Sequence, residues 1–139
     1  MADTFTIEIA TPERLLFRDE ATEAQIPAKD GYLGVLPGHA PLLSLLGVGV
    51  LTFSNQQGQR HVMAIRGGFL EILDNCVRVL TDRAQLDKEV DVAQAEKDLK
   101  TAQDALVNPA AGIDIAQGLI EVMDAQARID AARSSSSGS

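Results

Sequence analysis

The side chains best suited to acid–base, nucleophilic or metal chemistry are few in this sequence of 139 residues: two histidines and one cysteine. His39 and His61 lie on different segments, and Cys76 has no second cysteine with which to form a disulfide or a metal cluster. The sequence also lacks a glycine-rich phosphate-binding loop and the serine elbow of a hydrolase. Catalysis requires a nucleophile or base with an orienting partner. We therefore predict no catalytic site, no metal and no cofactor.

The densest feature runs from Gly31 to Leu43 and reads GYLGVLPGHAPLL. Proline fixes the backbone angle φ and glycine permits conformations that are closed to other residues, so a segment rich in both follows a defined irregular path. His39 lies at its centre. Two interpretations remain open from composition: a long turn joining two strands, or a rigid recognition loop that presents His39 and nearby apolar groups to a partner.

The elements that must position this segment are predicted to be β-strands, because apolar and polar residues alternate from Thr4 to about Thr81. Successive side chains of a strand point to opposite faces, so a period of two indicates strands with one buried face. Many short strands at close spacing favour an antiparallel β-sandwich or a flattened barrel. The alternation is clearest for Phe5, Ile7 and Ile9, for Thr22, Ala24 and Ile26, and for Leu51 and Phe53 against Val48, Val50 and Thr52.

Turn residues separate these predicted strands. Asp74 and Asn75 stand between two apolar runs, and both residue types tolerate left-handed backbone geometry, so they predict a hairpin turn. The segment 55–58 ends in a glycine and also reads as a hairpin loop. The pair Gly67-Gly68 inside a strand region predicts a bulge or a close backbone approach.

After Leu86 the hydrophobic period changes to that of a helix. Acidic residues at Asp87, Glu89 and Asp91 are expected in the first turns, where the helix dipole favours anions. The segment 108–112 contains proline and glycine and should end this helix, and Asp114 should cap a second one, giving an antiparallel hairpin. The predicted apolar faces are Val92, Ala95, Leu99, Ala102 and Leu106 on the first helix, and Ile115, Leu119, Val122, Ala125, Ile129 and Ala132 on the second.

We therefore predict three parts: a β-sandwich domain in residues 1–84, a helical hairpin in residues 85–133, and a flexible Ser-rich tail in residues 134–139. Alanines such as Ala95 and Ala125 recur along the helical seam, and they bury little apolar area. Gly118 weakens the second helix by about 1 kcal/mol relative to alanine. A marginal, movable hairpin and a stable hairpin with an ordinary alanine seam are both consistent with this pattern.

Composition limits the classes of partner. The formal net charge of −8 disfavours binding to nucleic acid and to anionic lipid, and favours docking onto basic protein surfaces. The most apolar stretch, from Leu42 to Val50, is too short to span a bilayer, so we expect no direct membrane insertion. The start of the sequence is acidic and alternating, unlike a signal peptide.

Several of these segments resemble the F-type ATP synthase epsilon subunit family. The stretch from Gly31 to Leu43 resembles its G-x-x-G-[IV]-L-P-x-H-A-P-L-L motif, and the stretch from Gly67 to Ile72 resembles its G-G-F-x-[EK]-[IV] strand. The order of a strand-rich half and a helical half also agrees, from Thr4 to about Arg133. The resemblance implies a β-sandwich followed by a two-helix domain.

The resemblance further implies a non-catalytic subunit of the central stalk, which couples rotation driven by proton or sodium flow to ATP synthesis. Its partners would be the gamma subunit, the c-ring and, when the hairpin extends and inhibits ATP hydrolysis, the alpha/beta head. The isolated chain would be a monomer. It would act at the cytoplasmic face of a bacterial inner membrane, or alternatively on the stromal or cytoplasmic side of a thylakoid membrane. Carried over by position, the gamma interface would include Pro37, Gly38, His39, Pro41 and Leu42, and the c-ring would face Lys29, Asp30, Gly31 and Tyr32.

The sequence departs from the family pattern at two places. Some bacterial members bind ATP through an [IL]-D-x-x-R-A motif, and here Asp91 and Ala95 remain whereas Gln94 stands in place of arginine. Glutamine lacks the fixed charge and bidentate geometry that suit a nucleotide, so we predict weak or absent ATP binding. The last helix, with Arg128 and Arg133 among more numerous acidic residues, is less basic than inhibitory helices of the family, which predicts weak inhibition.

Two other classes of protein compete with this resemblance. The first is a generic binding module, a sandwich with a coiled-coil tail for oligomerisation, although aromatic residues that would line its pocket make up only 4% of the sequence. The second is a small hydrolase or isomerase using His39 or His61, which lacks a partner constellation.

Overall fold

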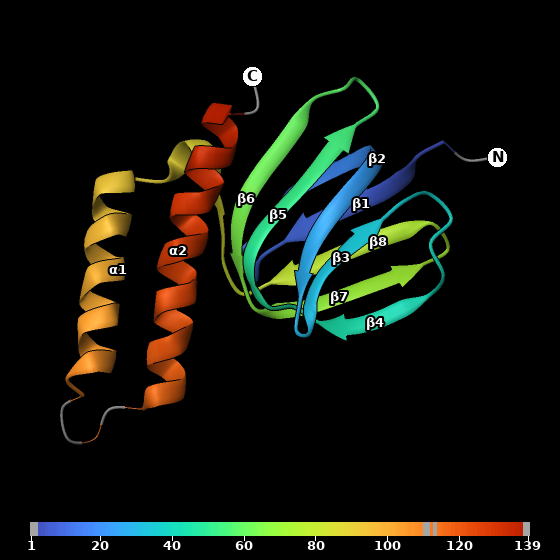
Figure 1. Ribbon diagram of the computed structural model, residues 1–139. Coiled ribbons are helices and arrows are strands. Elements are labelled where there is room, and N and C mark those ends of the chain that lie inside the picture. Colours follow the sequence, from blue (N-terminus) through green and yellow to red (C-terminus); the bar gives the residue numbers. More distant parts are fainter. Residues whose placement is uncertain (1–2, 110–111, 113, 138–139) are drawn as a thin grey trace.

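The computed structural model describes residues 3–109, 112 and 114–137, with side chains up to residue 134, and shows a β-sandwich followed by a pair of antiparallel helices (Figure 1). The predicted fold class is therefore confirmed. The strands are β1 (Phe5–Ala10), β2 (Leu15–Ala28), β3 (Gly31–Val35), β4 (Leu42–Leu45), β5 (Val48–Asn55), β6 (Arg60–Arg66), β7 (Gly68–Leu73), β8 (Cys76–Thr81) and β9 (Ala84–Leu86). A 3-10 turn η1 (Asp87–Glu89) leads to the helices α1 (Val92–Val107) and α2 (Ile115–Ser137).

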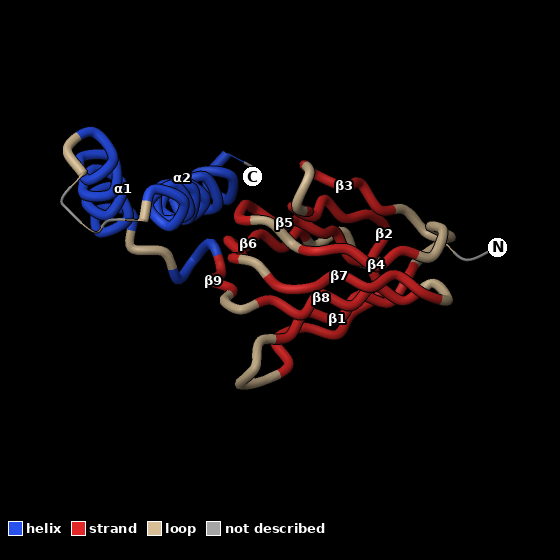
Figure 2. The backbone as a smooth tube through the Cα atoms, turned by 90° about the horizontal axis from the view of Figure 1, so that it is seen from below, coloured by secondary structure: helices blue, strands red, loops and turns tan. Residues whose placement is uncertain are grey.

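The long strand β2 turns one hydrogen-bonded sheet into two packed layers (Figure 2). Its first half pairs with β1, its second half pairs with β3 and β5, and its pairing register shifts between Ala21 and Glu23. A bulge of this kind bends a strand and strengthens its twist. The strands of the sheet lie in the order β4-β7-β8-β1-β2-β5-β6-β9, and β3 pairs with β2 outside this order. Strands β1 and β8 are parallel, and the other neighbouring pairs are antiparallel.

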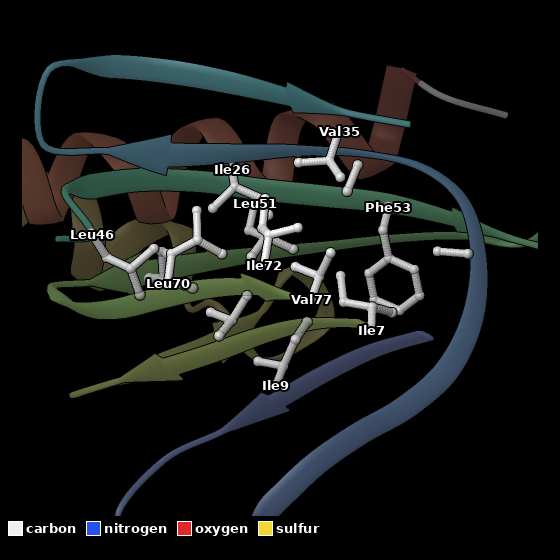
Figure 3. Close-up of a cluster of buried hydrophobic side chains, with 14 of the residues drawn as sticks. Ile7, Ile9, Ile26, Val35, Leu46, Leu51, Phe53, Leu70, Ile72 and Val77 are labelled. Atoms are coloured by element: carbon white, nitrogen blue, oxygen red, sulfur yellow. The ribbon is translucent and has the colours of Figure 1, made fainter. Parts of the chain in front are cut away.

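The core lies between these two layers (Figure 3). The alternation in β1 places Phe5, Ile7 and Ile9 inside, as predicted, each at most 1% exposed. In β5 the inward residues are Leu51 and Phe53, while the opposite positions face α2. Burial of large aliphatic side chains from both layers provides the main favourable free energy of the sandwich. Further core residues are Ile26, Val35, Leu46, Leu70, Ile72 and Val77.

One turn and one close approach between strands agree with the sequence prediction. Asp74 and Asn75, with φ of 52° and 59°, form the tight turn between β7 and β8, and both adopt the left-handed geometry that this type of hairpin requires. Gly68 lies against the neighbouring strand, where an added Cβ would overlap the carbonyl oxygen of Leu80. A side chain at this position would collide with backbone, which explains the glycine.

The start of the helical half differs from the sequence prediction. We expected Asp87 and Glu89 in the first turns of the helix, but they form the separate turn η1, and α1 starts only at Val92. The reason is local hydrogen bonding: the Glu89 carboxylate accepts a bond from the Leu86 backbone N–H, and the Asp91 carboxylate caps α1 by accepting from the Gln94 N–H at 3.1 Å. Glu89 therefore holds the turn η1, and Asp91 holds the start of α1.

The boundaries of the predicted parts also shift. Strand β9 extends the sheet to Leu86, just beyond the expected domain boundary at residue 84. Asp114 caps α2, as predicted, by accepting from the Ala116 N–H at 2.9 Å. The helix α2 continues to Ser137, past the expected end of the hairpin at Arg133, and residues 138–139 lie outside the described residues. The predicted break at 108–112 is described only at 108, 109 and 112.

The helix α2 buries two faces rather than one, because it lies between α1 and the sandwich (Figure 1). Ala125 and Ile129 are buried, as predicted, and Ala127 and Ala131 form a cluster with Val62 of β6. The prediction for the start of the helix was wrong: Ile115 and Leu119 are about half exposed. A single periodic stripe in a sequence cannot reveal a helix that packs on two sides.

Candidate interaction surfaces

One outer face of the sandwich carries large apolar side chains that are exposed to solvent. We call it the apolar outer face and define it by Leu43, Leu45, Phe69, Leu73 and Leu80 of β4, β7 and β8. These side chains are between 44% and 74% exposed. Leu45 pairs with Phe69 and Phe69 pairs with Leu80, so they form a continuous row across the strands. Large contiguous apolar surfaces of this kind mark interaction sites.

A row of charged residues crosses the same face beside the apolar row. Arg18 lies 3.2 Å from Glu8, Arg78 lies 3.3 Å from Glu8, and Arg78 lies 3.7 Å from Glu71. Exposed ion pairs contribute little to stability. Because their opposite charges are already paired with one another, the desolvation penalty of covering this face with a partner is lower.

The loop between β3 and β4 borders the apolar outer face and contains most of the predicted gamma-interface residues. The side chain of Asn75 holds it: the amide oxygen accepts from the Gly38 N–H at 2.9 Å, and the amide nitrogen donates to the Thr4 carbonyl at 2.8 Å. The His39 N–H donates to the Leu36 carbonyl at 3.2 Å. The loop is therefore a braced segment, and this geometry favours the recognition-loop interpretation.

The members of this predicted set differ in orientation. Gly38 and Pro41 are exposed, whereas Pro37 and His39 are half-buried. Leu42 packs against the core, and the next residue, Leu43, is 74% exposed. Sequence reasoning missed the apolar outer face beyond Leu42. Its signal was present, because β7 carries large apolar residues on both of its alternating faces.

The turn between β2 and β3 lies at the other end of β3 and contains the predicted c-ring-facing residues. Lys29, Asp30 and Gly31 are exposed at its tip. The Lys29 N–H donates to the Leu45 carbonyl at 3.0 Å, so the turn is braced by the end of β4. Tyr32 is 60% exposed, but its hydroxyl accepts from the Val50 N–H at 2.9 Å, so its tip points toward β5 rather than away from the turn.

The residues of the incomplete nucleotide motif all have structural partners. Asp91 caps α1, and Ala95 is fully buried in the helical seam. The Gln94 side-chain amide donates to the Asp98 carboxylate at 2.9 Å. This bond and a second one from Arg128 hold the pKa of Asp98 below its ordinary value. Each of these three residues therefore has a structural role in the helices that requires no bound nucleotide.

A cluster of charges joins the hairpin to the sandwich, and sequence reasoning did not anticipate it. Asp124 of α2 is only 4% exposed in its side chain and is hydrogen-bonded by Arg83. Arg66 of β6 lies 3.6 Å from Asp124 and 2.5 Å from Glu121. The bond from Arg66 lowers the pKa of Glu121, and the same bond raises the pKa of Arg66. In the sequence these residues look like ordinary surface charges.

The histidines have structural environments of their own. The His61 ring stacks on Phe53 with centroids 4.7 Å apart, and the His39 Nδ1 lies 2.7 Å from the Ala40 carbonyl oxygen. Within the described ranges, no group of three His, Cys, Asp or Glu side chains could hold a metal ion. Neither α1 nor α2 combines the length and apolar character needed to cross a bilayer.

Sequence comparison identifies relatives across nearly the whole chain. The profile of the ATP synthase delta/epsilon chain β-sandwich domain matches residues 4–87. The ATP synthase epsilon chain of Solibacter usitatus is 50% identical over 129 residues, which covers 93% of this chain and 96% of that one. The epsilon chain of Koribacter versatilis is 43% identical over 106 residues, which covers 76% and 74% respectively.

Solved structures share the fold at lower identity. A chain in the Euglena gracilis mitochondrial ATP synthase structure of OSCP, F1 and c-ring has a TM-score of 0.84 and 23% identity, and the match covers 96% of this chain and 83% of that one. A chain in the central stalk and c-ring structure from Tetrahymena thermophila has a TM-score of 0.61 and 14% identity, with 95% and 96% covered.

Proposed function

Because this chain belongs to the ATP synthase epsilon chain family, we propose that it is a non-catalytic subunit of the rotary central stalk, where it couples rotation to ATP synthesis. The similar chains from Euglena and Tetrahymena come from assemblies that include the c-ring, and the second assembly is described as a central stalk. Relatives from bacteria favour an assembly at the cytoplasmic face of a bacterial inner membrane, driven by proton or sodium flow.

The apolar outer face is the observation that carries this proposal. Residues such as Leu43, Phe69 and Leu80 remain about half exposed or more, although the chain has its own helices with which it could have covered them. Full burial of such a side chain contributes about 1.5–3 kcal/mol, and roughly half of this remains to be gained here, so a partner that covers the row still gains binding free energy. We assign this surface, with the neighbouring loop residues Pro37–Leu42, to the gamma subunit.

The turn between β2 and β3 suits contact with the c-ring. It projects from the end of the sandwich, and its tip carries the exposed pair Lys29 and Asp30. Opposite charges at a tip favour polar contact with loops of a partner rather than insertion into lipid. Because the turn is braced by β4, a load at the tip is passed to a strand that forms part of the apolar outer face.

The hairpin is the regulatory element of this proposal. It lies folded against β5 and β6 here, through small side chains and a few ion pairs, and it detaches and extends to reach the alpha/beta head. Its second helix is acidic at Glu121, Asp124 and Asp130, so acidic loops of a partner repel it and inhibition of hydrolysis is weak. Deleting the chain from Asp87 onward should raise ATPase activity of the reconstituted head only slightly. A large rise would contradict weak inhibition.

ATP binding to the hairpin is weak or absent in this proposal, since Gln94 replaces the arginine and Asp91 and Ala95 serve the helix itself. Isothermal titration of the isolated chain should show no heat below about 1 mM ATP. Micromolar affinity would contradict this part of the proposal and leave the assignment to the central stalk intact.

The decisive test of the central-stalk role is binding to gamma. The isolated chain should elute as a monomer in size-exclusion chromatography and shift to a complex of one chain with one gamma subunit when mixed. A generic binding module with an oligomerising tail would elute as an oligomer and would form no complex with gamma. Absence of any complex with gamma would overturn the proposed function.

A further inference from the structure

Strand β6 lies beside α2 (Figure 1). The face of β6 toward this helix carries two arginines at its ends and small apolar residues between them. The residues of this face contact α2 in reverse order, because the strand and the helix run in opposite directions. At one end of β6, Arg60 donates to Ser134 at 3.2 Å. In the middle, Val62 and Ala64 pack against Ala127 and Ala131. At the other end, Arg66 pairs with Glu121 and Asp124.

The apolar part of this contact does not define where α2 sits along the strand. Hydrophobic attraction has no direction, and alanine and valine offer smooth, shallow surfaces. Ala127 and Ala131 are about one helical turn apart. After a slip of α2 by one turn in either direction, one of the two alanines therefore still lies against Val62 or Ala64.

The charged part does define the position. The Asp124 carboxylate is bonded by Arg83 and lies 3.6 Å from Arg66 and 3.4 Å from Arg128. Arg66 and Arg83 belong to the sandwich, so they stay in place when the helix moves. A slip of one turn would bring Ile120 or Arg128 to the place of Asp124. The first would leave the partly buried Arg66 and the half-exposed Arg83 without this carboxylate, and the second would place a third cation beside them. Both changes are costly where the site is partly dehydrated.

We propose that Asp124 is the residue that sets the register of the docked hairpin on the sandwich. The alanines and valines supply the attraction, and the carboxylate among the arginines selects one position along β6. Because the anion is part of the chain, the docked state is defined without a bound ligand. The regulatory meaning of this register rests on the proposed function of the hairpin, but the register itself is a property of the isolated chain.

The test measures the distance between nitroxide labels on exposed positions of the two domains. Labels at Gln57 in the β5–β6 turn and Gln103 in α1, in a Cys76→Ser background, should give one narrow distance distribution. A slip of one turn moves the helix by about 5 Å, which pulsed electron paramagnetic resonance resolves. We expect Asp124→Asn to reduce the native distance population at least tenfold relative to displaced or undocked ones, because it removes the charge partner of the sandwich arginines.

Three further variants separate this role from general stability. Glu121→Gln removes an ion-pair partner that is 44% exposed, so it should keep the native distance and lower the docked fraction only slightly. Val62→Ala removes apolar area and should lower the docked fraction without a new distance. Arg83→Met removes the arginine that pairs with Asp124. Because the Arg83 side chain is half exposed, this variant should fold, and it should show the same displaced distance population as Asp124→Asn.

The proposal is overturned if Asp124→Asn, with its sheet intact by circular dichroism, and Arg83→Met both keep the single native distance. If Asp124→Asn does not fold, Arg83→Met decides alone. These distances are measured without gamma, so failure of gamma binding would refute the proposed function and leave the register result unaffected.

Discussion

The two outer faces of the sandwich differ in the size of their apolar residues and in what covers them. The face of β4, β7 and β8 presents leucine and phenylalanine side chains that remain exposed, whereas the face of β5 and β6 presents valine and alanine side chains that α2 covers. The apolar area that each side chain can bury is therefore larger on the open face than on the covered one. In the proposed function, gamma therefore binds the open face tightly, and the hairpin is held on the covered face weakly enough to detach.

The proposed function thus assigns a lasting contact and a detachable contact to two faces of the same sheet. Large side chains supply affinity, and the charges of the ion-pair row beside them compensate one another locally. Small side chains supply little affinity, so the position of the hairpin must be specified by directional contacts such as those of Asp124. Affinity and specificity are thus assigned to different faces of the same layers.

The largest expected effect comes from placing a charge on the open face. Phe69→Asp should weaken gamma binding by about 30-fold or more, the size expected when a central apolar contact is lost, without unfolding the sandwich, since Phe69 is 56% exposed. Surface plasmon resonance with immobilised gamma measures this. Leu119→Asp is the matched control, because Leu119 on α2 is 51% exposed and should leave gamma affinity unchanged. Equal losses in both variants would remove the distinction between the two faces.

An intermediate effect should follow from truncation inside the hairpin. Ile129→Ala removes a side chain that is 2% exposed and should destabilise the hairpin by about 2 kcal/mol, the lower end for such truncations, because the seam is thin. Hydrogen exchange should show faster opening of α1 and α2 with β1 and β8 unchanged, and gamma binding should survive. Ile115→Ala, at a position 49% exposed, is the control with little expected effect. Loss of gamma binding in Ile129→Ala would show that the anchoring role belongs to the hairpin.

The smallest effect concerns pH. The Arg66 bond lowers the pKa of Glu121 in the folded chain, and bonds from Gln94 and Arg128 lower that of Asp98. A carboxylate with a lowered folded-state pKa stabilises the fold fully above its ordinary value, 4.5 for Glu121, and this contribution is lost as the pH falls through the folded-state pKa. The docked distance population should therefore fall below about pH 4.5. Glu121→Gln should flatten part of this dependence, and a population constant from about pH 6 to about pH 3 would contradict it.

Much of the fold followed from local patterns. The period of two predicted the strands because a strand must turn alternate residues to its two sides, and Asp74-Asn75 predicted the tight turn because few other residues accept its geometry. The change of period after Leu86 predicted the hairpin, and Asp114 its second cap. The motif around His39 indicated the family by its residue types and spacing alone, and the Asn75 side chain braces its loop.

What local patterns could not reveal are the features that depend on which elements become neighbours. The exposed row of Leu45, Phe69 and Leu80 exists because β4, β7 and β8 lie side by side on an uncovered face, and their sequence reads like that of ordinary core strands. Asp124 and Arg66 are far apart in the chain, and their pairing arises only when α2 lies on β6. The sequence alone determined the elements and the family, because propensity and periodicity are local. The tertiary structure decided which side chains stay open to a partner and which charges meet, because burial and pairing depend on distant parts of the chain.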